Sequence, residues 1–153
     1  MSHNFIVWLF PCSSFAITIT VILIISLLLG CTNDTVVDLG FALDGSNSID
    51  ANEYRLTKDF VKDIIRMFSI SKTGTHVGLL EYAARAVIRV RFDEFSETDE
   101  LLKDVEGLKQ SRGASTNIGV GLDKTLQLFS KRYGARDEVR LVQTAGPDCL
   151  KPD

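Results

Sequence analysis

The chain of 153 residues lacks any Asp, Glu, Lys or Arg in its first 30 positions. All 17 Lys and Arg and all 20 Asp and Glu therefore follow residue 30, and the formal net charge is -3. An apolar leader thus precedes a polar segment that is long enough for about one domain. This distribution excludes a fully disordered chain, a collagen-like chain and a multi-pass membrane protein.

Basic runs and cysteines are also scarce. Without clustered Lys and Arg the chain cannot neutralise many phosphates, which argues against nucleic acid as a partner. Its cysteines, Cys12, Cys31 and Cys149, are too few and too far apart for a disulfide scaffold or a zinc site.

The leader contains an apolar run from Phe15 to Leu29, preceded by a shorter run over residues 5–10. A signal-peptide core needs about 7 to 15 apolar residues and a membrane span about 20. Residues 1–31 are therefore predicted to be a hydrophobic N-terminal helix that serves as a signal peptide or as an uncleaved signal anchor. The first basic residue is Arg55, so no charge bias decides between them. In both cases residues 35–153 are exported, either secreted or anchored to a membrane with the domain outside the cytoplasm.

Two short motifs lie near the end of the leader. Leu28-Leu29-Gly30-Cys31 is similar to the lipidation box of bacterial lipoproteins, in which the cysteine is acylated. Asn33-Asp34-Thr35 is an N-glycosylation sequon, which has meaning only in a eukaryotic protein.

The polar segment alternates between strand and helix patterns. Residues 36–43 form an apolar run typical of a strand buried on both faces. Asp50 and Glu53 form a capping-box pattern that begins a helix, with an apolar face through Phe68. That face is predicted to contain Tyr54, Leu56, Phe60, Val61, Ile64, Ile65 and Phe68.

Further along, residues 76–82 and 86–92 are predicted strands, separated by only three residues. Such a short link permits an antiparallel hairpin and excludes a parallel crossover. Apolar spacing predicts helices over 98–108 and from Ile118 to Phe129, with Ile118, Leu122, Leu126 and Phe129 facing the core. A last strand is predicted over 138–144. The resulting fold class is α/β, with a mostly parallel sheet and one antiparallel edge strand.

Oxygen-bearing side chains follow the first buried strand. Asp44, Ser46 and Ser48 alternate in this loop, and Gly45 permits a tight turn beneath them. A carboxylate and hydroxyls are hard oxygen donors of the kind that Mg²⁺ and Mn²⁺ prefer. Serine and aspartate also cap helix starts, so this loop alone does not decide between a cation site and a cap.

A second loop, Gly113-Ala114-Ser115-Thr116-Asn117-Ile118-Gly119, makes a family resemblance specific. Together with VDLGFALDGSNSI, HVGLLEY and GARDEVRLVQTAG, it resembles the von Willebrand factor type A domain over roughly residues 36–148. The resemblance implies a Rossmann-like three-layer fold and a metal-ion-dependent adhesion site. Asp44, Ser46, Ser48 and Thr116 match the metal-binding positions of that site, which implies Mg²⁺ or Mn²⁺ as the cofactor.

The third loop of the family pattern differs. Family members usually carry Thr-Asp-Gly where this chain has Thr144-Ala145-Gly146, so one carboxylate stands where two are usual. Loss of a carboxylate from such a site costs about 10- to 100-fold in affinity, which predicts weak or conditional metal binding. Asp148 is a candidate to reach the site through water. Family domains also continue beyond this point, so the domain is expected to be incomplete at its C-terminus, with an exposed last strand.

Family domains are often closed by a disulfide between their ends, which directs attention to Cys31 and Cys149. If the first and last strands are parallel, these residues lie about 20 Å apart, at opposite ends of the sheet. A disulfide needs Cα atoms within about 7 Å, so unpaired or intermolecular cysteines are expected.

Three functions follow as hypotheses. The first is an exported, non-enzymatic adhesion module that binds acidic residues of extracellular matrix or cell-surface proteins through the cation. This module has no nucleic-acid partner, and it contacts a membrane only through an uncleaved leader. The second is a phosphotransfer-type hydrolase with Asp44 as nucleophile, disfavoured because Ser46 stands where those enzymes have aspartate and no catalytic motif occurs. The third is a degenerate remnant without metal-dependent binding, motivated by Ala145.

Overall fold

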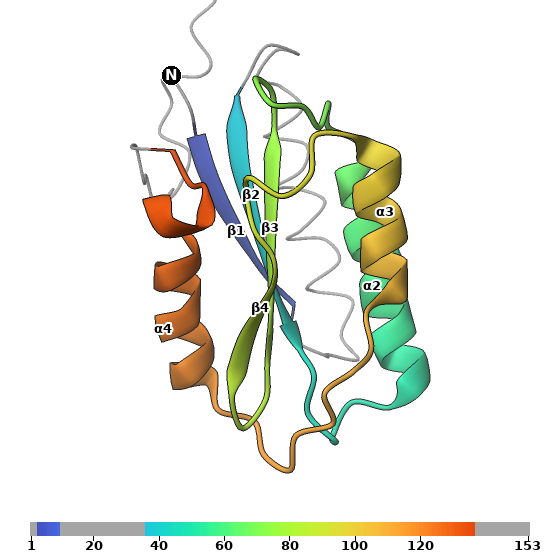
Figure 1. The fold of residues 1–153 in the computed structure, drawn as a ribbon. Coiled ribbons are helices and arrows are strands. Elements are labelled where there is room, and N and C mark those ends of the chain that lie inside the picture. The colour runs from blue at the N-terminus through green and yellow to red at the C-terminus, as the bar shows by residue number, and fades with distance from the viewer. Residues whose placement is uncertain (1–2, 10–35, 137–153) are drawn as a thin grey trace, which may run out of the picture.

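The computed structural model describes residues 3–9 and 36–136 of the chain. Its sheet has the order β1 (His3–Leu9), β2 (Val37–Asp44), β3 (His76–Tyr82) and β4 (Ala86–Val90). The first three strands are parallel, and β4 is antiparallel to β3 at the edge (Figure 1). The predicted mixed sheet with one antiparallel edge strand is therefore confirmed.

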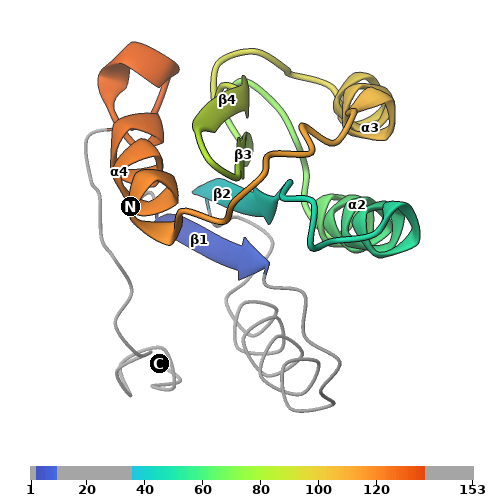
Figure 2. The same cartoon turned by 90° about the horizontal axis from the view of Figure 1, so that it is seen from below.

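Helices cover both faces of this sheet. Figure 2 shows α2 (Ala51–Ile65) and α3 (Thr98–Gly107) on one side and α4 (Ile118–Leu128) on the other. A short 3₁₀ helix, η1 (Lys131–Tyr133), follows α4. The result is the three-layer α/β arrangement that the sequence predicts.

Strand β2 lies at the centre of the core, and all eight of its residues are buried. Leu39, Phe41 and Leu43 face α2 and α3, whereas Ala42 packs on the α4 side with Leu80. A strand buried on both faces is typically a nearly continuous apolar run, and residues 36–43 show this pattern apart from Asp38.

The start of α2 confirms the predicted capping box. The Asp50 carboxylate accepts hydrogen bonds from the Asn52 and Glu53 backbone N–H groups at 2.8 and 2.9 Å. The Glu53 carboxylate in turn accepts from the Asp50 N–H at 2.9 Å. The helix ends at Ile65, before the predicted Phe68, and Leu56 is 52% exposed and not part of the buried face.

Replacing Asp50 by Ala is expected to lower the free energy of unfolding by about 1 kcal/mol, because two backbone N–H groups lose their acceptor. Chemical denaturation measures the change. Asp63→Ala in the same helix removes an exposed carboxylate that caps nothing, and it should cost less than about 0.5 kcal/mol. Equal losses in the two variants would contradict the capping role.

Strand β4 departs from the regular alternation of faces along a strand. Leu79 pairs with Val90 and Leu80 with Ile88, so one extra residue, Arg89, lies in β4. A bulge of this kind turns the following side chain to the opposite face. Val90 therefore packs with α2 and α3 while Ile88 packs toward α4, although regular alternation would place both on one face.

The predicted apolar face of α4 is wrong in most of its members. Ile118, Leu122 and Leu126 are 45%, 50% and 63% exposed. The buried face consists of Gly121, Thr125 and Leu128, followed by Phe129. Small residues allow the helix to approach the sheet closely, so packing against β3 selects this face over the more apolar stripe.

Residues 3–9 form the parallel strand β1, so the N-terminal helix predicted over residues 1–31 is wrong for these seven residues. β1 pairs with β2 from His3 opposite Val37 to Leu9 opposite Leu43. A short continuous apolar run is compatible with a strand as well as with a helix, and periodicity alone does not distinguish them.

Several predictions fall outside the described residues. They concern the apolar run 15–29, the sequon, the cysteines, the strand over 138–144, and Ala145 and Asp148. Within residues 3–9 and 36–136, no helix has the length and apolar character needed to cross a bilayer.

Candidate metal centre at the carboxyl ends of the strands

Asp44, the last residue of β2, is the predicted anionic ligand. Its side chain is buried, with the residue 6% exposed, and its Oδ1 accepts a hydrogen bond from the Ser46 N–H at 2.8 Å. None of the ion pairs among the described residues involves Asp44. A buried carboxylate without a cationic partner is costly, so this position favours a bound cation.

The charge of Asp44 also acts on Tyr82, which lies opposite it in the register of β2 and β3. Burial raises the pKa of the Tyr82 hydroxyl, and the nearby Asp44 carboxylate raises it further. Asp44 therefore acts as a negative charge on its buried neighbour in β3.

Ser46 and Ser48 bring their hydroxyls together. Their Oγ atoms are 2.8 Å apart, Ser46 being buried and Ser48 exposed. Neighbouring oxygens around an octahedral Mg²⁺ with metal–oxygen distances of about 2.1 Å are about 3 Å apart. The two hydroxyls thus have the spacing of adjacent ligands, and one carboxylate with two hydroxyls fits a hard divalent cation.

The second predicted loop is attached to the first. The Asn47 N–H donates to the Gly113 carbonyl at 2.9 Å, and Ser46 and Gly113 form a parallel bridge. The Gln110 side-chain amide donates to the carbonyls of Ser46 and Ile49, both at 2.9 Å. These contacts fix the backbone beneath the serine hydroxyls.

Thr116 lies three residues after this bridge, in the exposed turn before α4. The next residue, Asn117, caps α4 by accepting from the Val120 N–H at 3.1 Å, and its own N–H donates to the Ala83 carbonyl at 2.9 Å. Among the described residues, no hydrogen bond joins Thr116 to Asp44, Ser46 or Ser48. The structure therefore brings its loop to the site, and its role as a ligand stays a prediction.

Two comparisons bear on this arrangement. The family model of the von Willebrand factor type A domain matches residues 38–145, which is more than half of the chain. The chain belongs to the von Willebrand factor type A family. The resemblance in the sequence is thereby confirmed, and with it the fold class.

Relatives in this family are much longer proteins. The human collagen alpha-6(VI) chain is 30% identical over 102 residues, which are 67% of this chain and 4% of the collagen. Bovine vitrin is 29% identical over 117 residues, 76% of this chain and 18% of vitrin. The chain therefore spans only a small part of the relatives it matches.

Solved structures of proximal thread matrix protein 1 from the mussel byssus share the fold. One superposes with a TM-score of 0.63 at 24% identity, covering 68% of this chain and 28% of that one. Another structure of the mussel protein has zinc in its metal-ion-dependent adhesion site (MIDAS) motif. It superposes with a TM-score of 0.64 at 23% identity and covers 70% of this chain and 29% of the mussel chain. That protein, which shares the fold, thus holds zinc at its MIDAS motif.

Glu81 is a buried residue of β3 that the sequence analysis missed. One of its carboxylate oxygens accepts from the Ser111 N–H at 2.8 Å, and the other accepts from Arg89 at 2.6 and 3.0 Å. Glu81 also bonds to the Tyr54 hydroxyl, whose pKa is raised by burial first and by Glu81 second. The signal for Glu81 in the sequence was a single acidic residue within the otherwise apolar run HVGLLEY. Glu81 connects the second loop to the sheet, and its charge is already neutralised by Arg89.

Gly45 is required by this arrangement. A Cβ at position 45 would lie 2.0 Å from the Glu81 Oε1 and 2.7 Å from the Ser111 Oγ. Any side chain there would push apart Glu81 and the loop that it holds. The sequence predicts a tight turn at Gly45, and the structure adds this packing reason.

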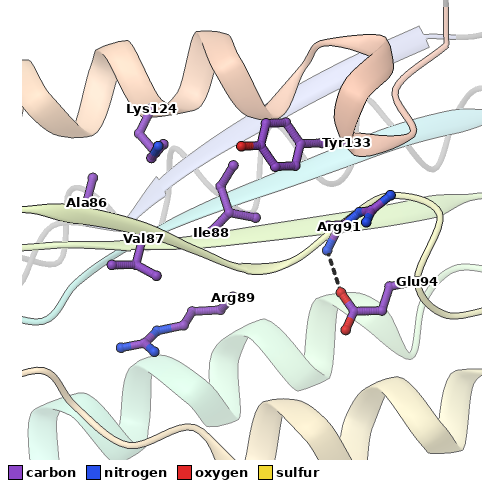
Figure 3. Close-up of a pocket in the computed structure, with 8 residues that line it drawn as sticks. All are labelled: Ala86, Val87, Ile88, Arg89, Arg91, Glu94, Lys124 and Tyr133. Atoms are coloured by element: carbon purple, nitrogen blue, oxygen red, sulfur yellow. Dashed lines mark hydrogen bonds between the residues drawn. The ribbon is translucent and has the colours of Figure 1, made fainter.

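An open hollow on the described surface lies elsewhere, around β4. In Figure 3, Ile88, Lys124 and Tyr133 lie on the side of β4 that faces α4, whereas Val87 and Arg89 point to the other side of the strand. Its charged groups already have partners. Arg89 bonds to Glu81, the Arg91 guanidinium pairs with Asp93, and Lys124 donates to the Gln127 side chain. The Glu94 carboxylate accepts from the backbone N–H of Arg91 at 2.9 Å. This hollow offers no converging ligands. Within residues 3–9 and 36–136, no group of three or more His, Cys, Asp or Glu side chains lies close enough together to hold a metal ion.

Proposed function

We propose that this chain is an extracellular protein-binding module that binds Mg²⁺ or Mn²⁺ and, through it, a carboxylate of a matrix or cell-surface protein. Asp44 would be the anionic ligand, and Ser46, Ser48 and Thr116 the neutral ligands. The bound ion supplies a positive charge to which a partner carboxylate can bind, and nothing is chemically transformed. The buried Asp44 carboxylate without a cationic partner is the observation that carries this proposal.

The ligand set supports an ion that retains an open position. One carboxylate and three hydroxyls leave an octahedral Mg²⁺ short of ligands, so water or a partner oxygen completes the shell. With a single protein carboxylate the bound ion keeps net positive charge, which favours an anionic partner group. The collagen VI and vitrin relatives, together with the byssal thread matrix protein, support partners in the extracellular matrix and an exported location.

The test is binding of the full chain to immobilised collagens with excess Mn²⁺ or with chelator. We expect binding that needs Mn²⁺ and falls by about 10-fold or more when the carboxylates of the immobilised collagen are converted to amides. Glu97→Gln, a change in an exposed carboxylate away from both loops, serves as the matched control and should bind like the unmodified chain. Binding that is indifferent to chelator and to amidation would rule out the metal-dependent mechanism.

A further inference from the structure

Arg112 has a left-handed backbone conformation beside the candidate metal centre. Its φ is 53°, and within residues 3–9 and 36–136 it is the only residue other than glycine with a positive φ. The Cβ of an ordinary residue is strained in this region, so glycine would be the more stable residue at this position. Strained residues of this kind gather at functional sites, which directs attention to the Arg112 side chain.

The backbone on both sides of Arg112 is attached to the loop that carries the proposed ligands. On one side, the Ser111 hydroxyl donates to the Gly45 carbonyl at 3.3 Å. On the other, the Gly113 carbonyl accepts from the Asn47 N–H at 2.9 Å. Gly45 and Asn47 alternate with the proposed ligands along that loop. These contacts impose the conformation of Arg112 and fix its position relative to the ligands.

The Arg112 side chain has no partner of its own in the described part of the chain. Arg112 is exposed, and no ion pair or hydrogen bond among the described residues engages its guanidinium. Arg89, by contrast, is neutralised by Glu81. A guanidinium presents its N–H groups in a planar fork that binds both oxygens of a carboxylate. Arg112 is therefore a cation that is available to an anionic group of a partner.

Given the metal-dependent function proposed above, on which this step rests, we propose that Arg112 binds a second carboxylate of the partner, next to the one on the ion. The module then prefers acidic protein segments with two neighbouring Asp or Glu residues. The ion and Arg112 are attached to the same pair of bonded loops, so their separation is set before the partner arrives. Preorganisation of this kind lowers the entropic cost of binding, and it offsets the strain at position 112.

Labelled peptides of defined charge test this preference. The peptide acetyl-Gly-Glu-Glu-Gly-amide has two carboxylates, whereas acetyl-Gly-Glu-Gln-Gly-amide and acetyl-Gly-Gln-Glu-Gly-amide have one each. Fluorescence anisotropy measures their binding to the full chain in mild detergent, with excess Mg²⁺ or with chelator. We expect the peptide with two carboxylates to bind about 10-fold more tightly than either of the others, and only with Mg²⁺.

Variants at position 112 assign the second carboxylate. Arg112→Gln should abolish the difference between the peptides, whereas Arg112→Lys, which keeps the charge but not the fork, should retain part of it. Arg112→Gly should also abolish it, and it should raise Tm by about 4 °C relative to Arg112→Gln because the strain is relieved. Arg66→Gln removes an exposed arginine at the far end of α2 from the candidate site, and it should bind all three peptides like the unmodified chain.

Three results would overturn the proposal. Equal affinities for the three peptides, or no binding of any of them, would show that no second carboxylate is recognised. A preference that survives Arg112→Gln would assign the second carboxylate to another group. Peptide binding that ignores chelator would contradict the metal-dependent function as well. If collagen binding needed Mn²⁺ while the peptides bound equally, the proposed function would stand and the role of Arg112 would not.

Discussion

Replacing Asp44 by Asn is expected to change the stability of the domain in opposite directions with and without metal. Without metal, the variant should have a free energy of unfolding that is higher by about 1 kcal/mol or more, because a buried charge without a cationic partner is removed. The amide oxygen can still accept the hydrogen bond from the Ser46 N–H, so the loop keeps its turn. Stability is therefore gained at the expense of the metal site.

With metal, the order should reverse. A ligand at 100 times its Kd stabilises a folded protein by about 2.7 kcal/mol, and Mn²⁺ should do so for the unmodified chain. The introduced asparagine offers no negative charge, and the remaining ligands are neutral hydroxyls, so affinity should fall by about 100-fold or more. Calorimetric titration with Mn²⁺ and thermal unfolding with and without Mn²⁺ measure both effects.

Asp63→Asn is the matched control for this experiment. Asp63 lies on α2 in an exposed pair with Arg66, so the variant makes the same chemical change outside both loops. It should leave Mn²⁺ affinity unchanged and alter stability by less than about 0.5 kcal/mol. If Asp44→Asn and the unmodified chain were stabilised equally by Mn²⁺, the metal site would not include Asp44.

Local sequence patterns predicted much of this fold. β2 and β3 follow from apolar runs of strand length, and α2 follows from the capping box formed by Asp50 and Glu53. The patterns failed where a distant contact decides the outcome. In α4 the closely packing Gly121 and Thr125 face the sheet although Leu122 and Leu126 are more apolar, and in β4 the bulge at Arg89 arises only on pairing with β3.

The candidate site was likewise only partly predictable from the sequence. Asp44, Ser46 and Ser48 lie within five residues, so the geometry of one turn brings their oxygens together and the sequence is sufficient to predict it. Glu81 and Gln110 support the two loops through hydrogen bonds to residues 30 or more positions away along the chain, which no local pattern records. Long-range supports of this kind are what sequence reasoning misses.

The largest gain of function is expected from Ala145→Asp. Family members usually carry aspartate at this position, so the variant restores a second carboxylate to the proposed metal site. The added negative charge should tighten Mn²⁺ binding by about 10- to 100-fold.

Calorimetric titration with Mn²⁺ measures this gain, which corresponds to about 1.4 to 2.8 kcal/mol of binding free energy. Ala145→Ser is the control, since it adds a polar group without a charge, and it should bind Mn²⁺ like the unmodified chain. Equal Mn²⁺ affinities for Ala145→Asp and the unmodified chain would place position 145 outside the metal site.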